Sequence, residues 1–580
     1  MKDIIPHIFK KEFKIPQEER LANAIGRFSA TEKIIFGILA TILMISAVSL
    51  LWQVNQNFLV SVPAEGGSFS EGIIGTPRFI NPVIAISDAE RDMTSLVYSG
   101  LLKANTDGTL IPNLAKNYTI SDDGLIYTFY LKDNIFFHDG TPITSDDVEF
   151  TITQIQDPSI KSHKRANWDG VTVEKIGEKQ IRFILKKPYS PFIENTTIGI
   201  IPKHIWKNVS TDEFAFSQFN IEPVGSGPYQ IKSINRDSGG LIQYYELSPF
   251  KKYALGKPYI SSIFMRFYPN EKALLSAYKS GYIQNINGIA PQEAELLKTK
   301  GVRIETTPLP RIFAVFLNQN NVPLFADQAI RQALNIAMPK EAILKEVLQG
   351  YATAIDGPIP STVNSINPES FDDRINEAKQ ILAKDGWQIN QAGILEKKTK
   401  KDTSVLQFSL ATSNTPELRQ SAEIIKSAWA KLGINVTIKI FDTGDLNQNI
   451  IRTRKYDALL FGEIIGRDPD LFAFWHSSQR NDPGLNIAMY VNSKVDKILE
   501  DARAISNPED RKAKYKEFDD IIHQEIPALF VYSPNFIYVV AKDIEGFSLG
   551  QITTSGDRFA NINEWYINTD QVWKIFVNNN

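Results

Sequence analysis

The chain of 580 residues contains no cysteine, which excludes disulfide bonds, thiolate metal sites and cysteine nucleophiles. Histidine is scarce as well: there are six, and none stands at the His-Glu-x-x-His spacing or at another metal-ligand spacing. A nucleophile with a neighbouring base is not visible either. These absences predict that the protein is not an enzyme and has no catalytic residues, no metal and no cofactor.

An excess of positive charge is also missing. Lys and Arg number 63 against 66 Asp and Glu, which gives a formal net charge of −3. Without a basic footprint, we expect no nucleic-acid partner. Gly225-Ser226-Gly227 does not predict a nucleotide site, because a third glycine is absent and Pro228 stands where a helix should begin. The length itself is sufficient for two or more lobes with full cores.

The apolar run Ile34–Trp52 has 19 residues and no charge. As a helix it would be about 28 Å long, close to the roughly 30 Å hydrocarbon core of a bilayer. Lys and Arg are frequent before the run, whereas after it the first is Arg78. The positive-inside rule therefore predicts a cytoplasmic tail (1–33), a transmembrane anchor (34–52), a short polar linker (53–66) and an extracytoplasmic remainder.

A cleaved signal peptide is the alternative interpretation of this segment. Against it, the 33 residues before the run are many for a signal peptide, and no Ala-x-Ala site closes the run. Val62-Pro63-Ala64 is the nearest candidate, but it lies well past the run and has proline in the middle. We therefore favour a retained single-pass anchor in the cell membrane.

The stretch Tyr98–Phe150 predicts a β-hairpin that leads into a capped helix. One strand face is apolar, because Leu125, Tyr127, Phe129 and Leu131 alternate with Ile126, Thr128, Tyr130 and Lys132. Ile135–Phe137 reads as a short second strand. Thr144 and Asp147 stand at capping-box spacing ahead of an apolar helical pattern.

Four submotifs in this stretch carry a resemblance to a known family. They are Tyr98-Ser99-Gly100-Leu101-Leu102, Ile111-Pro112-Asn113-Leu114-Ala115, Ser121-Asp122-Asp123-Gly124-Leu125 with Tyr127-Thr128-Phe129, and Phe137-His138-Asp139-Gly140-Thr141-Pro142 with Thr144, Asp147 and Val148. Their order and spacing resemble the extracytoplasmic solute-binding proteins of the peptide/nickel (family 5) ABC importers. The resemblance continues to about residue 570. Many relatives are tethered through a lipid-modified cysteine, so this cysteine-free chain needs another anchor.

The resemblance implies an α/β fold, two-lobed and periplasmic-binding-protein-like (type II, cluster C), with an inserted β-rich subdomain in addition to the N-terminal transmembrane helix. We expect lobe I at 67–310 with the insertion at about 103–220, lobe II at 311–527, and a return to lobe I at 528–580. Val171–Val173, Gln180–Leu185 and Thr197–Ile201 are expected strands of the insertion. The crossover strands near Leu317 and Val531 would act as hinges.

Lobe II shows an α/β pattern in the sequence itself. Leu406–Leu410 predicts a strand, and a helix from Thr415 to Leu432 carries proline at its first position and glycine after its end. Ile434–Ile440 alternates as the next strand, which makes a right-handed βαβ unit. Further on we expect a strand at Tyr456–Phe461 and helices at Ser493–Ile505 and Pro508–Gln524.

The ligand cleft is expected at the carboxyl end of the strand that leads to Phe461. Backbone of Phe461, Gly462 and Glu463 would pair with an extended ligand. The resemblance adds backbone of the loop Ile86-Ser87-Asp88. Further candidates for ligand contact are Arg467, Trp475 and His476. The alternative is that Trp475 packs in the core and that Arg467 is an exposed loop residue.

One position departs from the family pattern. Relatives that take up peptides have an aspartate four residues before the proline that corresponds to Pro469, and it pairs with the free amino group of the peptide. Ile465 stands there in this chain. Because a buried ammonium group without a counter-charge costs several kcal/mol, either Glu463 substitutes for the aspartate or the ligand has no free α-amino group at this point.

The predicted function is that of a membrane-anchored, monomeric binding subunit of an ABC importer. It would capture oligopeptide-like ligands between its lobes and deliver them to the ABC permease and ATPase subunits. Two alternatives remain: a ligand-sensing receptor that signals through its short cytoplasmic tail, and a binder of a non-peptide solute such as an oligosaccharide or a metal chelate.

Overall fold

The computed structural model describes residues 25–360, 369–398 and 403–576. The chain divides into two compact units, one of residues up to Ala64 together with Asn568 onward, and one of Glu65–Ile567. Most of the predicted cytoplasmic tail lies outside the described residues.

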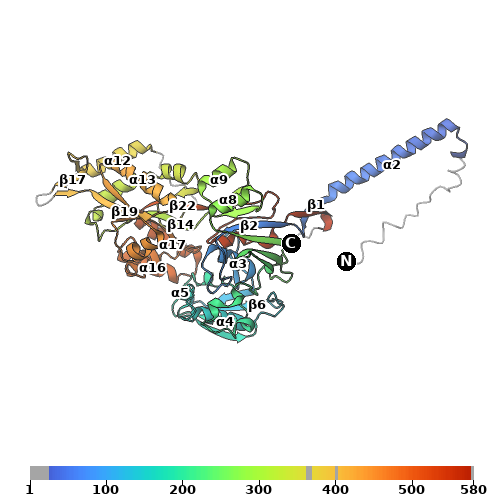
Figure 1. Cartoon of the computed structure of the whole chain (residues 1–580), viewed down its shortest axis with the longest axis horizontal. Helices are drawn as coiled ribbons and strands as arrows, with labels where there is room; N and C mark the ends of the chain where they lie inside the picture. Colours follow the sequence, from blue (N-terminus) through green and yellow to red (C-terminus); the bar gives the residue numbers. More distant parts are fainter. Residues whose placement is uncertain (1–24, 361–368, 399–402, 577–580) are drawn as a thin grey trace. The chain divides into compact units, whose positions relative to one another are not determined.

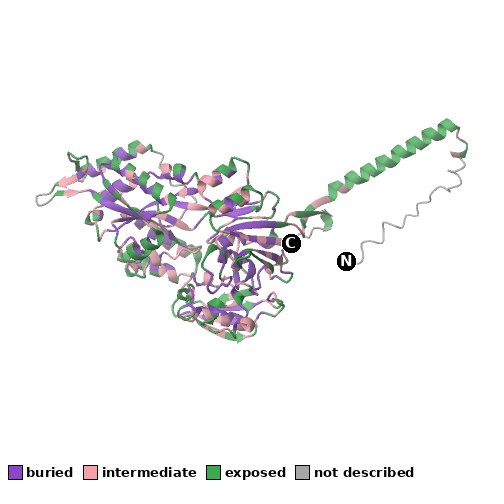
Figure 2. Ribbon diagram, viewed as in Figure 1, coloured by how far each residue is buried: buried purple, intermediate pink, exposed green. Residues whose placement is uncertain are grey.

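The small unit consists of one long helix and a two-stranded sheet. Helix α2 (Ala30–Phe58) begins with a capping box formed by Ser29 and Glu32, and none of its side chains is buried (Figure 2). It contains the whole predicted span, with a mean hydropathy of 2.6 in its most apolar window. Strand β1 (Leu59–Ala64) then pairs antiparallel with β23 (Asn568–Trp573).

This arrangement corrects two expectations about the ends of the chain. Residues 53–66 do not form a plain linker, because helix α2 continues to Phe58 and β1 follows directly. The chain after Asn568 does not pair with the strands of lobe I but with β1. Strand β1 has its partner at the other end of the sequence, which local composition does not reveal.

The large unit is built on one long mixed sheet with the order β20-β19-β21-β14-β22-β12-β2-β11-β10-β9. Strand β22 (Ala528–Val539) joins its two halves. The first part of β22 pairs with β14 (Arg311–Leu317), and the later part pairs with β13 (Ile304–Pro308) and β12 (Asn285–Asn287). The chain therefore crosses between the halves at Leu309–Pro310 and again at Ser533–Pro534, where Leu309 N–H donates to the Pro534 carbonyl at 2.9 Å.

The half that contains the predicted lobe II confirms the βαβ unit. Strand β19 (Gln407–Ser413), helix α13 (Pro416–Ala430) and strand β20 (Asn435–Phe441) follow one another, and the two strands are parallel. Strand β21 (Ala458–Ile464) lies between β19 and β14. Helices α12 (Phe371–Lys384) and α13 cover one face of these strands, and α16 (Ser493–Ala504) and α17 (Pro508–Glu525) cover the other (Figure 1).

The other half carries β2 (Ser68–Ile74), β11 (Ser262–Tyr268), β10 (Ile242–Pro249) and β9 (Tyr229–Arg236), with α3 (Asp88–Val97) packed nearby. The inserted subdomain forms its own sheet in the order β5 (Ala115–Ile120), β6 (Ile126–Leu131), β8 (Gln180–Ile184) and β7 (Thr172–Gly177). Helix α4 (Ser145–Gln156) lies between β6 and β7 in the chain and begins with the predicted Thr144–Asp147 capping box.

Two predicted strands of the insertion do not form. Of Ile135–Phe137, Phe136 makes only an isolated bridge to Pro142, because the chain reverses at once through Gly140, whose φ is 88°. Residues 197–201 contain buried isoleucines but are outside every strand. There the apolar residues fill the core as an irregular segment, tied by the Ile200 N–H to the Ser99 carbonyl at 2.9 Å.

A buried ion cluster fastens the closing segment of the large unit to its first strand. Arg558 has a fully buried side chain and contacts Glu71 of β2 at 2.8 Å and Asp92 of α3 at 2.7 Å. Tyr538 donates a hydrogen bond to Glu71 at 2.8 Å. Burial raises the pKa of Glu71 even though Arg558 acts in the opposite direction. Since buried charges are tolerated only when paired, this cluster is a single structural unit.

Candidate functional site

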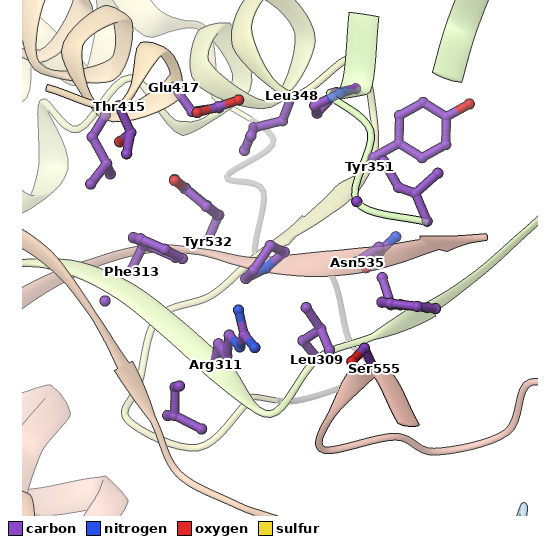
Figure 3. Close-up of a pocket in the computed structure, with 18 of the residues that line it drawn as sticks. Leu309, Arg311, Phe313, Leu348, Tyr351, Thr415, Glu417, Tyr532, Asn535 and Ser555 are labelled. Atoms are coloured by element: carbon purple, nitrogen blue, oxygen red, sulfur yellow. The ribbon is translucent and has the colours of Figure 1, made fainter. Parts of the chain in front are cut away.

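A cavity of about 520 Å³ lies where the two crossing connections meet (Figure 3). This volume falls within the roughly 300–1,000 Å³ that small-ligand pockets occupy. The lining combines both predicted lobes and the crossing strands. It includes Asp88, Asn287 and Ser555 from lobe I and the returning segment, Ser413, Thr415, Glu417 and Gly462 from lobe II, and Leu309, Arg311, Phe313, Tyr532 and Asn535 from the crossings.

Two aromatic rings form an apolar wall of the cavity. Phe313 of β14 and Tyr532 of β22 are cross-strand neighbours, and their rings stack with centroids 4.8 Å apart and planes at 16°. Burial raises the pKa of the Tyr532 hydroxyl, so it stays neutral. A flat aromatic pair of this kind offers contact area to an apolar or planar ligand group.

Charged groups enter the cavity from opposite sides. The guanidinium of Arg311 points into it from the crossing strand, and Glu417 in the first turn of α13 lies on the far side (Figure 3). Burial lowers the pKa of Arg311, and no described residue forms a hydrogen bond with the Arg311 Nε. Among the described residues no ion pair within 4 Å is found for Arg311, so its charge is available to a ligand.

The free edge of β21 supplies backbone groups. Ile465 N–H donates to the Pro310 carbonyl at 2.9 Å, which sets the alternation of the β14–β21 ladder. By that alternation, the polar backbone groups of Gly462 and Ile464 point away from β14. Strand β19 pairs with β21 only at Ala458 and Leu459, so within the described part of the chain no strand covers this edge beside the cavity. The cleft backbone predicted at 461–463 is therefore offered by Gly462 and Ile464.

Glu463 is one of the residues that line the cavity, but its side chain points away from the cavity into the core. It is the cross-strand partner of Ile312, whose side chain lies in the core on the sheet face opposite to Arg311 and Phe313. Both carboxylate oxygens of Glu463 are buried and have no hydrogen-bond partner among the described residues. Burial raises its pKa well above the ordinary value, which favours the neutral acid. This geometry does not favour Glu463 as the partner of a ligand ammonium group.

The other residues predicted for the cleft are distributed as follows. Asp88, Phe461 and Gly462 line the cavity. Ile86 and Ser87 do not; their backbone N–H groups donate to the Glu90 carboxylate at the start of α3.

Three candidates beyond β21 belong to the core instead. Ile465 and Trp475 are packed in the same core cluster, which is the alternative that we had named for Trp475. His476 stacks on Phe472 with ring centroids 4.0 Å apart.

Arg467 is neither an exposed loop residue nor a lining residue of this cavity. Its side chain is 12% exposed and bridges Glu194 of the inserted subdomain at 2.9 Å and Asp557 of the closing segment at 3.2 Å. Tyr189 adds a hydrogen bond to Asp470 at 3.1 Å. These contacts tie the predicted lobe II to the other half of the unit.

Sequence reasoning missed the residues that make the wall and the charges: Arg311, Phe313, Tyr532 and Glu417. The signal for Arg311 was present, since it is a single cation at the start of an otherwise apolar strand. No local signal identified Glu417 or Tyr532, because their place in the site depends on how three strands and a helix meet.

Comparison with known proteins gives a consistent result. Residues 109–484 match the middle region of the bacterial extracellular solute-binding proteins, family 5. The oligopeptide-binding protein AppA of Bacillus subtilis is 30% identical over 499 residues, which cover 84% of this chain and 89% of that protein. The dipeptide-binding protein of Escherichia coli is 24% identical and covers 82% of this chain and 90% of that protein.

Solved structures agree in fold. The structure of Bacillus subtilis AppA in complex with a nonapeptide has a TM-score of 0.65 at 28% identity and covers 87% of this chain and all of that one. NikZ from Campylobacter jejuni in complex with Ni(L-His) has a TM-score of 0.67 at 28% identity, with 86% of this chain and 99% of that chain covered.

Proposed function

The chain belongs to family 5 of the bacterial extracellular solute-binding proteins, and on this premise we propose that it is a membrane-anchored subunit that captures a peptide-like ligand in the cavity between its lobes. The family serves ABC importers and consists of binding proteins, not of enzymes. The predicted two-lobed α/β fold is confirmed by the solved relatives. The observation that carries the proposal is the cavity at the strand crossings, with an open strand edge and with Arg311, for which the described residues offer no ion pair.

The ligand would bind mainly through its backbone. Gly462 and Ile464 offer N–H and C=O groups on an open edge, so an extended peptide pairs there without a requirement on its sequence. Arg311 then receives an acidic group of the ligand, since a carboxylate accepts bonds from a guanidinium in a fixed geometry. The side of the cavity with Glu417 receives a cationic group. The carboxylate for an amino group would thus come from α13 and not from the position of Ile465.

A metal chelate is the second candidate, because NikZ was solved with Ni(L-His) and is as similar as AppA in identity. In the described part of the chain, no group of three or more His, Asp or Glu residues could hold a metal ion. A metal would therefore have to arrive with its own ligands. Arg311 would contact the carboxylate of such a chelate, which is the same chemistry as for a peptide.

The anchor is the second part of the proposal. Helix α2 is long and apolar enough to span a membrane, and no side chain in it is buried. The strand pairing of β1 with β23 supports retention of the helix, because a cut near Val62 would leave β23 without most of its partner. The monomeric protein would then remain in the cell membrane with its large unit outside, beside the ABC permease and ATPase subunits.

Thermal unfolding of the full-length protein in detergent micelles tests the ligand assignment. The panel consists of tri- to hexapeptides with free and acetylated N-termini and with free and amidated C-termini, together with Ni(L-His). A ligand that binds the folded state raises the unfolding midpoint by mass action. We expect a rise with free peptides that amidation of the C-terminus reduces.

The variant Arg311→Met and the control Arg452→Met complete this experiment. Arg452 pairs with Asp482 in an exposed bridge away from the cavity. Arg311→Met should abolish the dependence on the ligand carboxylate, and Arg452→Met should leave it unchanged. No rise with any peptide, combined with a rise with Ni(L-His), would replace the peptide by a chelate as ligand.

A further inference from the structure

The small unit exposes large apolar side chains at the end of the predicted span and beyond it. Trp52 is 63% exposed and Phe58 is 52% exposed on α2, and Trp573 at the end of β23 is 46% exposed. Ile575 is 74% exposed in the short turn η9 (Lys574–Phe576). Such a cluster is unfavourable in water and indicates a surface that is covered by something apolar.

The position of this cluster along the helix can be worked out from the sequence. Ile34–Trp52 fills the hydrocarbon core, and the helix continues for six residues to Phe58, which is about 9 Å at 1.5 Å per residue. The polar headgroup layer adds roughly 5–8 Å on each side of the core. Asn55 therefore lies within the headgroup layer and Phe58 at its outer edge.

Strand β23 is held beside the end of helix α2, at the level of the headgroup layer. Leu59, the first residue after the helix, is the cross-strand partner of Trp573. The indole stacks on Phe58 with ring centroids 6.4 Å apart. Its Nε1–H donates to the Asn55 side-chain oxygen at 2.9 Å, so the ring reaches back along the helix toward the span. The backbone of Trp573 is thus level with Leu59, and the hydrogen bond places its indole at the depth of Asn55.

We propose that Trp573 and Ile575 are a second membrane contact, which inserts into the interfacial layer of the outer leaflet beside the end of helix α2. This inference rests on the proposed anchoring by α2. The expected partner is the phospholipid bilayer itself, since tryptophan prefers the level where an apolar body and a polar tip are both satisfied. Among the described residues of this unit after Trp52, Lys574 is the sole Lys or Arg, so anionic lipid is not required.

The absence of cysteine makes a site-specific test direct. Single variants Leu43→Cys, Ile575→Cys and Asp570→Cys of the full chain are labelled with the same environment-sensitive fluorophore and reconstituted in phosphatidylcholine nanodiscs. Leu43 lies inside the predicted span, and Asp570 lies three residues up β23 from Trp573. Iodide in the water and nitroxide-bearing lipids report the exposure and the depth of each label.

We expect the Ile575 label to show a several-fold lower iodide quenching constant than the Asp570 label and to be quenched by nitroxides at the headgroup level. Adding Trp573→Ala to Ile575→Cys should restore iodide access. A deep Leu43 label together with a fully aqueous Ile575 label would overturn this inference and leave the anchor intact. An aqueous label at both positions would overturn the anchor and this inference together.

One further outcome separates lipid from protein as the partner. If the Ile575 label is aqueous in nanodiscs but protected in native membranes, a membrane protein covers this surface and the lipid contact is refuted.

Discussion

The buried carboxyl of Glu463 predicts an unusual dependence of stability on pH. Its two oxygens are buried without partners in the described part of the chain, and burial raises its pKa well above the ordinary value. In the unfolded chain the carboxyl has an ordinary pKa near 4.3, so unfolding above that pH releases a proton. The free energy of unfolding therefore falls as pH rises between the unfolded and the folded pKa, with a slope of about 1.4 kcal/mol per pH unit from this residue.

Glu463→Gln removes this proton while it keeps the shape of the side chain. At about pH 4 the Glu463 carboxyl is mostly neutral in both the folded and the unfolded chain, so we expect the wild type and the variant to be similarly stable. As the pH rises above about 5, the wild type should lose stability relative to the variant by about 1.4 kcal/mol per pH unit until the folded-state pKa is reached, so the variant becomes the more stable protein. The assay is urea unfolding followed by tryptophan fluorescence at a series of pH values.

Ile465→Val is the matched control, because it perturbs the same core cluster without a titratable group. It should lower stability by about 1 kcal/mol at every pH, parallel to the wild type. If the curves of Glu463→Gln and the wild type are also parallel, Glu463 is ionised or paired in the folded protein, and the reasoning from its burial is wrong.

Three other substitutions have defined expectations. Gly462→Val should weaken peptide binding in a titration and lower stability by about 1–3 kcal/mol, because a Cβ there would stand 2.7 Å from the Phe313 ring. The control Gly444→Val should not affect binding, because no atom lies within 4 Å of a Cβ at that position. Arg558→Met should lower the unfolding free energy by about 3–5 kcal/mol by stranding Glu71 and Asp92, and adding Glu71→Gln and Asp92→Asn should restore most of it in urea unfolding. Arg467→Gln should populate an open form with a larger radius of gyration in X-ray scattering and reduce peptide affinity; an unchanged radius would show that its two ion pairs do not hold the lobes closed.

Much of the local structure follows from the sequence because the signals are local. Neighbouring residues alone determine the capping box at Thr144 and Asp147 and the alternation of apolar residues in β6 and in the strands on either side of α13. The structure has these features where they were predicted. The family resemblance then supplied the long-range arrangement. At 197–201 the apolar residues alone predicted a strand, and the structure has none there.

The site was harder to predict because it depends on faces and partners. The strand around Gly462 was identified, but only the register with β14 reveals that Glu463 faces the core while Gly462 and Ile464 keep their backbone groups free. Trp475 is buried by helices distant in sequence. Likewise, the partner of β1 lies at the other end of the chain, and no composition rule connects residues 59–64 with 568–573.

The central claim is that a ligand pairs with the open edge of β21 inside the cavity. Amide hydrogen exchange, measured by mass spectrometry with and without a peptide that raises the unfolding midpoint, tests it most directly. With the ligand bound, we predict slower amide exchange at Gly462 and Ile464. We predict no change in the proteolytic fragments that cover the exposed part of α17. Protection elsewhere in the large unit, with unchanged exchange along Phe461–Ile464, would contradict the account.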